Sequence, residues 1–126
     1  DTELDAVLEN NKESREDHDV LRIMPQEYID FAQDANLLIC DSQYFDDEYP
    51  EKEGWGHPRA NTAVDWAVQS KVKHLALFHH DPMHSDKEVE EKVATCRDRA
   101  LAHGSDMIIS GSREGLEFRV SDEEEL

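Results

Sequence analysis

Three short apolar runs alternate with stretches of helical pattern, and this alternation restricts the fold more than any other feature of the chain. The runs predict strands at 36–42, 73–78 and 106–110. Each is almost continuously apolar, which is typical of strands buried on both faces. Strands that alternate with helices form largely parallel sheets, so the sequence predicts an α/β fold.

The segments between these strands carry helix signals. Between the first two strands, the spacing of alanine and tryptophan residues predicts an amphipathic helix over 59–70. Ser85 followed by Glu88 forms a capping-box signature before the next helix. That helix is expected to continue to about 102 and to end at Gly104, because glycine commonly follows the last helical turn.

The rest of the chain is less regular. Residues 3–22 are polar and acidic and predict a short helix or a loop, whereas 25–35 predict a short helix after a proline. An aromatic and acidic loop is expected at 43–57, an alternating edge strand at 116–120, and a solvated acidic tail at 121–126.

Composition limits the classes of function. With 126 residues the chain forms at most one domain, and its 13 Lys and Arg against 31 Asp and Glu give a formal charge of −18. Unaided binding to a nucleic-acid polymer is therefore not expected. Cys40 and Cys96 lie in apolar contexts and are interpreted as buried free thiols of a reducing compartment. No apolar run has the length of a membrane span, which predicts a soluble cytoplasmic protein.

Nitrogen and oxygen donors gather where the second expected strand ends, in LALFHHDPMHSD at 75–86. His79 sits at this rigid strand end and suits a metal ligand, and the alternatives are a histidine that contacts a ligand of the metal and a surface histidine. His80 would point to the opposite face if the strand continued, so the two histidines are not expected to bind the same ion. His84 follows a proline on a loop and is expected to be exposed.

Two further residues stand at positions that suit catalysis. Asp41 ends the first expected strand and is interpreted as a metal ligand, as a carboxylate that fixes a histidine tautomer, or as a turn cap. His57 lies in GWGHP, where glycines allow a sharp turn, and it suits a general acid near neutral pH. The alternative for His57 is a loop histidine bound to a carboxylate. Ligands of parallel α/β sheets collect at the carboxyl ends of the strands, so a site is expected there.

Three segments together resemble the C-terminal half of the metallo-β-lactamase superfamily, closest to its phosphodiesterase-like metallohydrolases and more distantly to the tRNA 3′-processing endonucleases. The segments are DTE at 1–3, LLICDSQYFDDEYPEKEGWGH at 37–57 and LALFHHDPMHSD at 75–86. The resemblance implies that residues 1–126 form part of a four-layer αββα sandwich. Its two sheets pack face to face, so one half alone would leave an apolar face for the N-terminal half, or for a second copy in a homodimer, to cover.

The resemblance also implies roles for single residues. Asp1 matches an aspartate that bridges two metal ions, and His79 matches a histidine ligand. His57 matches a histidine that helps to protonate the leaving group, with an acidic partner at the position of Asp41. Two divalent ions are the implied cofactors, with zinc expected first and manganese or iron as alternatives. Three more residues are expected around the ligands or at the entrance: His80, Asp81 and His84.

One part of the family pattern does not occur in the chain. The HxHxDH segment, which lies upstream of the bridging aspartate in the family, is absent from the 126 residues. Two protein ligands, Asp1 and His79, would not hold two ions tightly by themselves. The chain is therefore expected to be inactive alone and to act together with an N-terminal half of the same protein.

Three functions follow from these observations as hypotheses. The first is metal-dependent hydrolysis of phosphodiester bonds in a small substrate such as a cyclic nucleotide, because the acidic composition disfavours long RNA. The second is a thioester or lactam hydrolase on the same fold. The third is a non-catalytic regulatory module, which the missing HxHxDH segment favours.

Overall fold

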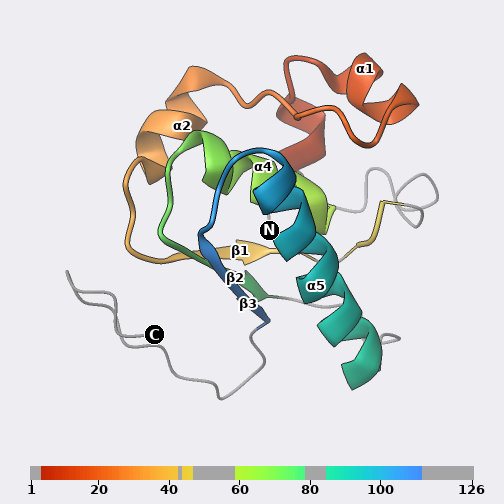
Figure 1. Cartoon of the computed structure of the whole chain (residues 1–126). Helices are drawn as coiled ribbons and strands as arrows, with labels where there is room; N and C mark the ends of the chain where they lie inside the picture. The colour runs from red at the N-terminus through yellow and green to blue at the C-terminus, as the bar shows by residue number, and fades with distance from the viewer. Residues whose placement is uncertain (1–3, 43, 47–58, 79–84, 112–126) are drawn as a thin grey trace.

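A parallel sheet forms the centre of the protein in this computed structural model, which describes residues 4–42, 44–46, 59–78 and 85–111. Its strands are, in sheet order, β1 (Leu38–Asp41), β2 (His74–Phe78) and β3 (Ile108–Gly111). All pairings are parallel, and the strand order follows the chain order (Figure 1). The α/β class and the three predicted strands are confirmed, with ends that differ from the prediction by no more than two residues.

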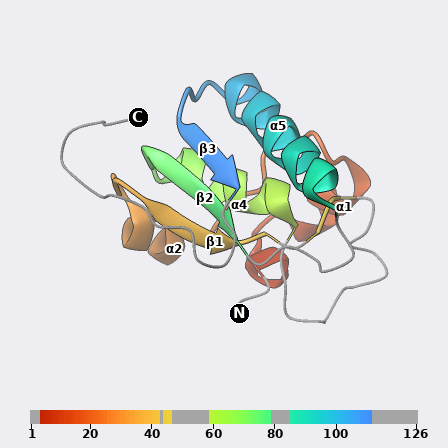
Figure 2. The ribbon, with the colours of Figure 1, turned by 90° about the horizontal axis from the view of Figure 1, so that it is seen from below.

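Two helices connect the strands in turn. Helix α4 (Ala60–Gln69) follows β1 and packs on β1 and β2, whereas α5 (Asp86–Ala102) follows β2 and packs on β3 and on α4 (Figures 1 and 2). Right-handed crossovers place successive helices on the same face of a parallel sheet, which explains why the two helices touch. Both helices confirm the prediction, and helix α2 (Gln26–Ala32), which packs against α4, confirms the short helix expected after Pro25.

The ends of α5 have the caps that its sequence predicts. The Ser85 hydroxyl accepts from the backbone N–H of Glu88, and the Glu88 carboxylate accepts from the backbone N–H of Ser85. After the helix, Gly104 has a φ of +84°, a conformation that glycine adopts without steric cost. The Ser105 N–H then reaches the Ala100 carbonyl at 2.9 Å, so the last turn is closed on itself.

Before α2, the described chain forms two short helical segments, η1 (Leu4–Val7) and α1 (Asn11–Glu16). The first is anchored in the core, because Leu4 and Leu8 are buried with the apolar residues of α4. The N-terminal region thus contains short helices, one of the two structures that the sequence allowed for 3–22. The predicted strand at 116–120 and the tail at 121–126 lie outside the described residues.

The two faces of the sheet differ. Alternate residues of the strands, such as Cys40, Leu77 and Ile109, are buried against the helices. On the other face, Ile39 is 54% and Phe78 is 42% exposed. Within the described residues this agrees with the expected uncovered apolar face, and what covers it stays a prediction.

The two cysteines are free and buried, as predicted. No helix among the described residues is long and apolar enough to cross a membrane.

Candidate functional site

The carboxyl ends of β1 and β2 lie side by side, at the edge of the sheet where a site is expected. Asp41, the last residue of β1, is in register with Phe78, the last residue of β2. The backbone N–H of Ser42 donates to the Phe78 carbonyl oxygen at 2.8 Å. The chain therefore leaves both strands from adjacent positions, and His79 is the next residue after Phe78 in the sequence.

Asp41 is the only one of the predicted site residues that the structure describes, and it lies half-buried at this edge. The others lie outside the described residues: Asp1, His57, His79, His80, Asp81 and His84. Within residues 4–42, 44–46, 59–78 and 85–111, no group of three or more His, Cys, Asp and Glu side chains is placed to hold a metal ion. The described side chains alone thus do not form a metal site, and the convergence of Asp1 and His79 stays a prediction.

The two ends of the 47–58 segment are held next to each other. Tyr44 and Arg59 form a parallel β-bridge, and the Ala60 N–H donates to the Tyr44 carbonyl at 2.8 Å. The Asn61 amide also donates to Asp46 at 3.0 Å. The segment that contains His57 in the sequence therefore begins and ends at one defined place beside the strand ends.

The buried carboxylate of Asp5, in the η1 segment, contacts Arg59 at this position. Its Oδ2 accepts from the Arg59 backbone N–H at 2.9 Å, and its Oδ1 accepts from Arg59 Nε at 2.7 Å. The same Oδ1 accepts from the Thr62 hydroxyl at 2.6 Å, and the Asp5 side chain is fully buried. Burial raises the pKa of the Cys40 thiol to about 12, with the charges of Asp41 and Asp5 acting in the same direction. The charge of Asp5 is therefore part of the electrostatic environment of Cys40 in β1.

A second carboxylate, that of Asp46, binds the fully buried guanidinium of Arg22 at 2.9 Å. Burial disfavours the charged form of Asp46, but Arg22 and the Asn61 hydrogen bond outweigh it and hold the pKa of Asp46 below its usual value. Burial is also the largest influence on Arg22 and lowers its pKa, although Asp46 opposes this. A buried pair of this kind is stable only with further hydrogen bonds, and Arg22 has one to Thr62 at 2.9 Å.

A third carboxylate, that of Asp65 in α4, pairs with Arg99 of α5. Arg99 Nε and Nη2 donate to the two Asp65 oxygens at 2.7 and 2.8 Å. Arg99 also donates to the carbonyls of His18 and Val20, so this pair joins both helices to the chain before α2.

Lys92 of α5 is nearly fully buried, and its ammonium group points to the chain that leaves β1. Lys92 Nζ donates to the Ser42 carbonyl at 3.0 Å and lies 5.3 Å from the centre of the Phe45 ring. Both contacts favour a cation, because the carbonyl oxygen and the ring face are electron-rich. Helix α5 thereby supports Ser42 and Phe45, described residues that follow β1.

The sequence interpretation did not single out these buried charges. Asp65 gave a usable signal, since it lies among the apolar residues Val64, Trp66 and Ala67 on the buried side of α4. Asp5 and Arg22 gave none, because Asp5 binds Arg59 54 residues away in the chain and the Arg22 guanidinium binds Thr62 40 residues away.

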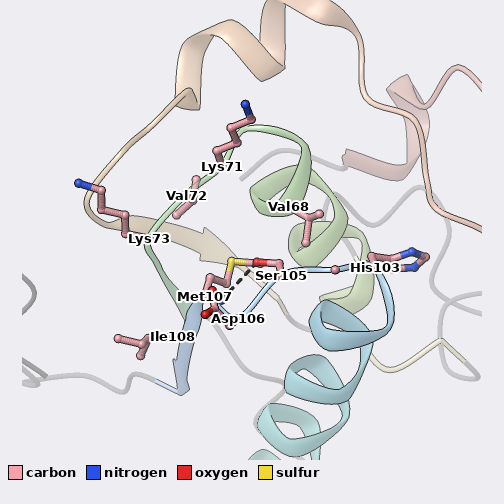
Figure 3. Close-up of a pocket in the computed structure, with 10 residues that line it drawn as sticks. Val68, Lys71, Val72, Lys73, His103, Ser105, Asp106, Met107 and Ile108 are labelled. Carbon is pink, nitrogen blue, oxygen red and sulfur yellow. Dashed lines mark hydrogen bonds between the residues drawn. The ribbon is translucent and has the colours of Figure 1, made fainter.

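A hollow of about 560 Å³ lies at the opposite end of the sheet, between the α4–β2 and α5–β3 connections. Figure 3 shows the ammonium groups of Lys71 and Lys73 turned away from Ser105 and Met107. The hollow lacks converging polar groups and lies at the amino ends of β2 and β3, where parallel sheets do not usually bind ligands. The carboxyl ends therefore remain the candidate site.

Comparisons with known proteins show what parts of the chain are similar to. No model of a known protein family matches the chain. Over 61 residues it is 36% identical to a ribonuclease Z from Sulfurisphaera tokodaii, and the matched region covers 48% of the chain and 20% of the relative. It is 28% identical over 93 residues to a ribonuclease Z from Pyrococcus furiosus, a match that covers 73% of the chain and 30% of the relative. It is 29% identical over 97 residues to a ribonuclease Z from Gemmatimonas aurantiaca, a match that covers 75% of the chain and 28% of the relative. The chain thus spans less than a third of the length of these curated relatives.

A solved structure has a similar fold. The metallo-β-lactamase fold protein YhfI from Bacillus subtilis matches 73% of the chain with 34% of its own length, at a TM-score of 0.56 and 16% sequence identity. The parallel sheet with helices on one face is therefore part of a metallo-β-lactamase fold. Together with the similarity to ribonucleases Z, this fold agrees with the resemblance to the metallo-β-lactamase superfamily that the sequence segments carry.

Proposed function

We propose that this chain is part of a metal-dependent hydrolase that cleaves phosphodiester bonds. The observation that carries the proposal is the similarity to ribonucleases Z, enzymes that act on a phosphodiester backbone, in a chain with a metallo-β-lactamase fold. The adjacent carboxyl ends of β1 and β2 support it, since Asp41 ends one strand and the His79–His84 segment follows the other.

In this proposal Asp1 and His79 are ligands of divalent ions, zinc being expected first, and the rest of a longer protein provides the remaining ligands. Such ions supply positive charge that neutralises a phosphodiester in the transition state. His57 donates a proton to the leaving oxygen, and Asp41 accepts a hydrogen bond from the imidazole and fixes its tautomer. His80, Asp81 and His84 line the entrance. The rest of the protein also covers the open face of the sheet at Ile39 and Phe78.

The proposed substrate is a small phosphodiester such as a cyclic nucleotide. A formal charge of −18 repels a polyanion, and contacts with many phosphates require a cationic surface. RNA is the second candidate, because the relatives are ribonucleases. Salt separates the two: RNA cleavage would weaken steeply as salt rises, whereas a small diester would show little dependence.

The experiment uses the natural protein that contains this chain. Its metal content is measured, and hydrolysis is assayed with bis-p-nitrophenyl phosphate, with 2′,3′- and 3′,5′-cyclic nucleotides, and with an RNA that has a 3′ extension. Hydrolysis of a small diester with bound metal supports the proposal. Rapid cleavage of the RNA alone would replace the substrate assignment, and bound metal without turnover of any diester would contradict the function.

A further inference from the structure

Strand β3 lies at one edge of the sheet in the part of the chain that the structure describes, because it pairs there with β2 alone. The peptide groups of successive residues in a strand point to opposite sides of it. The Ile108 N–H donates to the Lys73 carbonyl at 3.0 Å, so the peptide groups of Ile108 face β2. Those of Ile109 and Gly111 therefore face the outer edge of β3.

Arg97 of α5 reaches this outer edge. Figure 2 shows α5 running alongside β3, and Arg97 Nε and Nη2 both donate to the Ile109 carbonyl oxygen, at 3.0 and 2.8 Å. A carbonyl oxygen has two lone pairs, so these two N–H groups occupy its capacity to accept. Hydrogen bonds from a charged donor are about twice as strong as neutral ones. A backbone N–H of an added strand would therefore have to displace a stronger donor.

The sequence of β3 is that of a strand with a high tendency to pair. The segment MIISG at 107–111 contains two adjacent isoleucines and neither a charged residue nor a proline. Isoleucine favours strands, and short apolar segments without charge or proline are prone to pair with other chains. Proteins commonly protect such edges with charged side chains. The Arg97 guanidinium, placed on the Ile109 carbonyl, is in the position that this protection requires.

We propose that Arg97 closes the outer edge of β3 to strand addition, and that the partner it excludes is a second copy of this chain. Two copies would meet through the same edge about a two-fold axis, so that β3 pairs with β3. The inference does not depend on the proposed hydrolase activity or on a metal ion. A role for Arg97 only in holding α5 against β3 predicts lower stability and an unchanged assembly state.

The matched control is Lys87, an exposed cation of the same helix. It precedes Arg97 by ten residues, or roughly 15 Å of helix. Arg97→Ala and Lys87→Ala each remove one positive charge from a chain with a formal charge of −18, so both increase the repulsion between copies alike. Alanine has the highest helix propensity, so neither change should disrupt α5.

The first readout is the mass of the natural protein and of both variants by analytical ultracentrifugation over a series of concentrations. The unmodified protein and Lys87→Ala should have the same mass at every concentration. Arg97→Ala should shift toward a doubled mass as the concentration rises, although the lost charge increases repulsion. The comparison with Lys87→Ala separates the contact with Ile109 from the effect of charge.

The second readout is the rate of amide hydrogen exchange along β3, followed by NMR. In the unmodified protein the amides of Ile109 and Gly111 should exchange at least about tenfold faster than those of Ile108 and Ser110, which face β2. In Arg97→Ala the exchange of Ile109 and Gly111 should become slower as the concentration rises. This change would locate the new contact at the outer edge of β3.

Each readout is able to overturn the proposal by itself. An unchanged mass of Arg97→Ala, or an equal increase in Lys87→Ala, would show that Arg97 does not close the edge. Slow exchange of Ile109 and Gly111 in the unmodified protein would show that another strand already pairs with β3. Association of Arg97→Ala without slower exchange at these two amides would place the contact elsewhere.

Discussion

Two buried ion pairs among the described residues are alike in chemistry and differ in what they join. Asp5–Arg59 and Asp65–Arg99 share a 2.7 Å contact from Nε to a fully buried carboxylate. Asp65–Arg99 joins α4 to α5, neighbours in the helical layer. Asp5–Arg59 instead joins segments next to two proposed site residues. The difference predicts that the two pairs contribute alike to stability, whereas only Asp5–Arg59 contributes to the order of the segments beside the proposed site.

The largest expected effect tests whether the two pairs are equal in stability. Asp5→Ala and Asp65→Ala should each lower the free energy of unfolding by about 3–5 kcal/mol, because each leaves a buried arginine without its carboxylate. Urea denaturation of the natural protein, followed by tryptophan fluorescence, measures both. A cost below about 1 kcal/mol, as for exposed pairs, at only one site would break the comparison.

Arginine-to-lysine changes in the two pairs sharpen the comparison. Arg99 donates to both oxygens of Asp65 and to two carbonyls, and a lysine cannot reproduce this planar arrangement. Arg99→Lys should therefore cost about 2 kcal/mol, the range for hydrogen bonds to charged groups. Arg59→Lys should cost less, about 1 kcal/mol, because the bond from the Arg59 backbone N–H to Asp5 is unaffected by the change, whereas the four Arg99 bonds all come from its side chain. The same denaturation assay applies, and the reverse order would contradict the geometry described for the two arginines.

An exposed contact of α5 gives the scale for a small effect. Ser85→Ala removes the hydroxyl that accepts from the Glu88 N–H, and should lower the free energy of unfolding by about 1 kcal/mol. Ser85→Asp, which keeps a capping oxygen, is the control and should be close to neutral. A loss as large as that of the buried pairs would show that α5 is held mainly by its cap.

The smallest effect is a pH dependence from Asp46, the carboxylate that pairs with Arg22. Its pKa is lowered in the folded protein, so the unfolded chain binds the proton more tightly. The stabilisation is complete above the unfolded pKa of about 4 and is lost as the pH falls through the lower folded pKa. Asp46→Asn should therefore flatten the fall of the free energy of unfolding below about pH 4, and an unchanged acid limb would contradict this.

The sequence predicted those features that depend on neighbouring residues. The apolar runs at β1, β2 and β3, and the Ser85–Glu88 capping box, are local patterns, and the structure confirms them. The buried contacts of Asp5 and Arg22 were not predicted, because pairing across 40–57 residues leaves no periodic signal. For the site, the sequence predicted its place at the strand ends, where Asp41 lies.

The central claim is that the carboxyl end of β2 supplies a metal ligand, and the two histidines at the ends of this strand test it. His74 begins β2 and its Nε2 lies 2.8 Å from the Ser110 hydroxyl, whereas His79 follows the last residue of β2. The measurement is the number of metal ions per molecule of the natural protein by mass spectrometry. We predict about two ions in the unmodified protein, as in two-metal hydrolases, and in His74→Ala, with at least one ion lost in His79→Ala. Full metal content in His79→Ala would contradict the account.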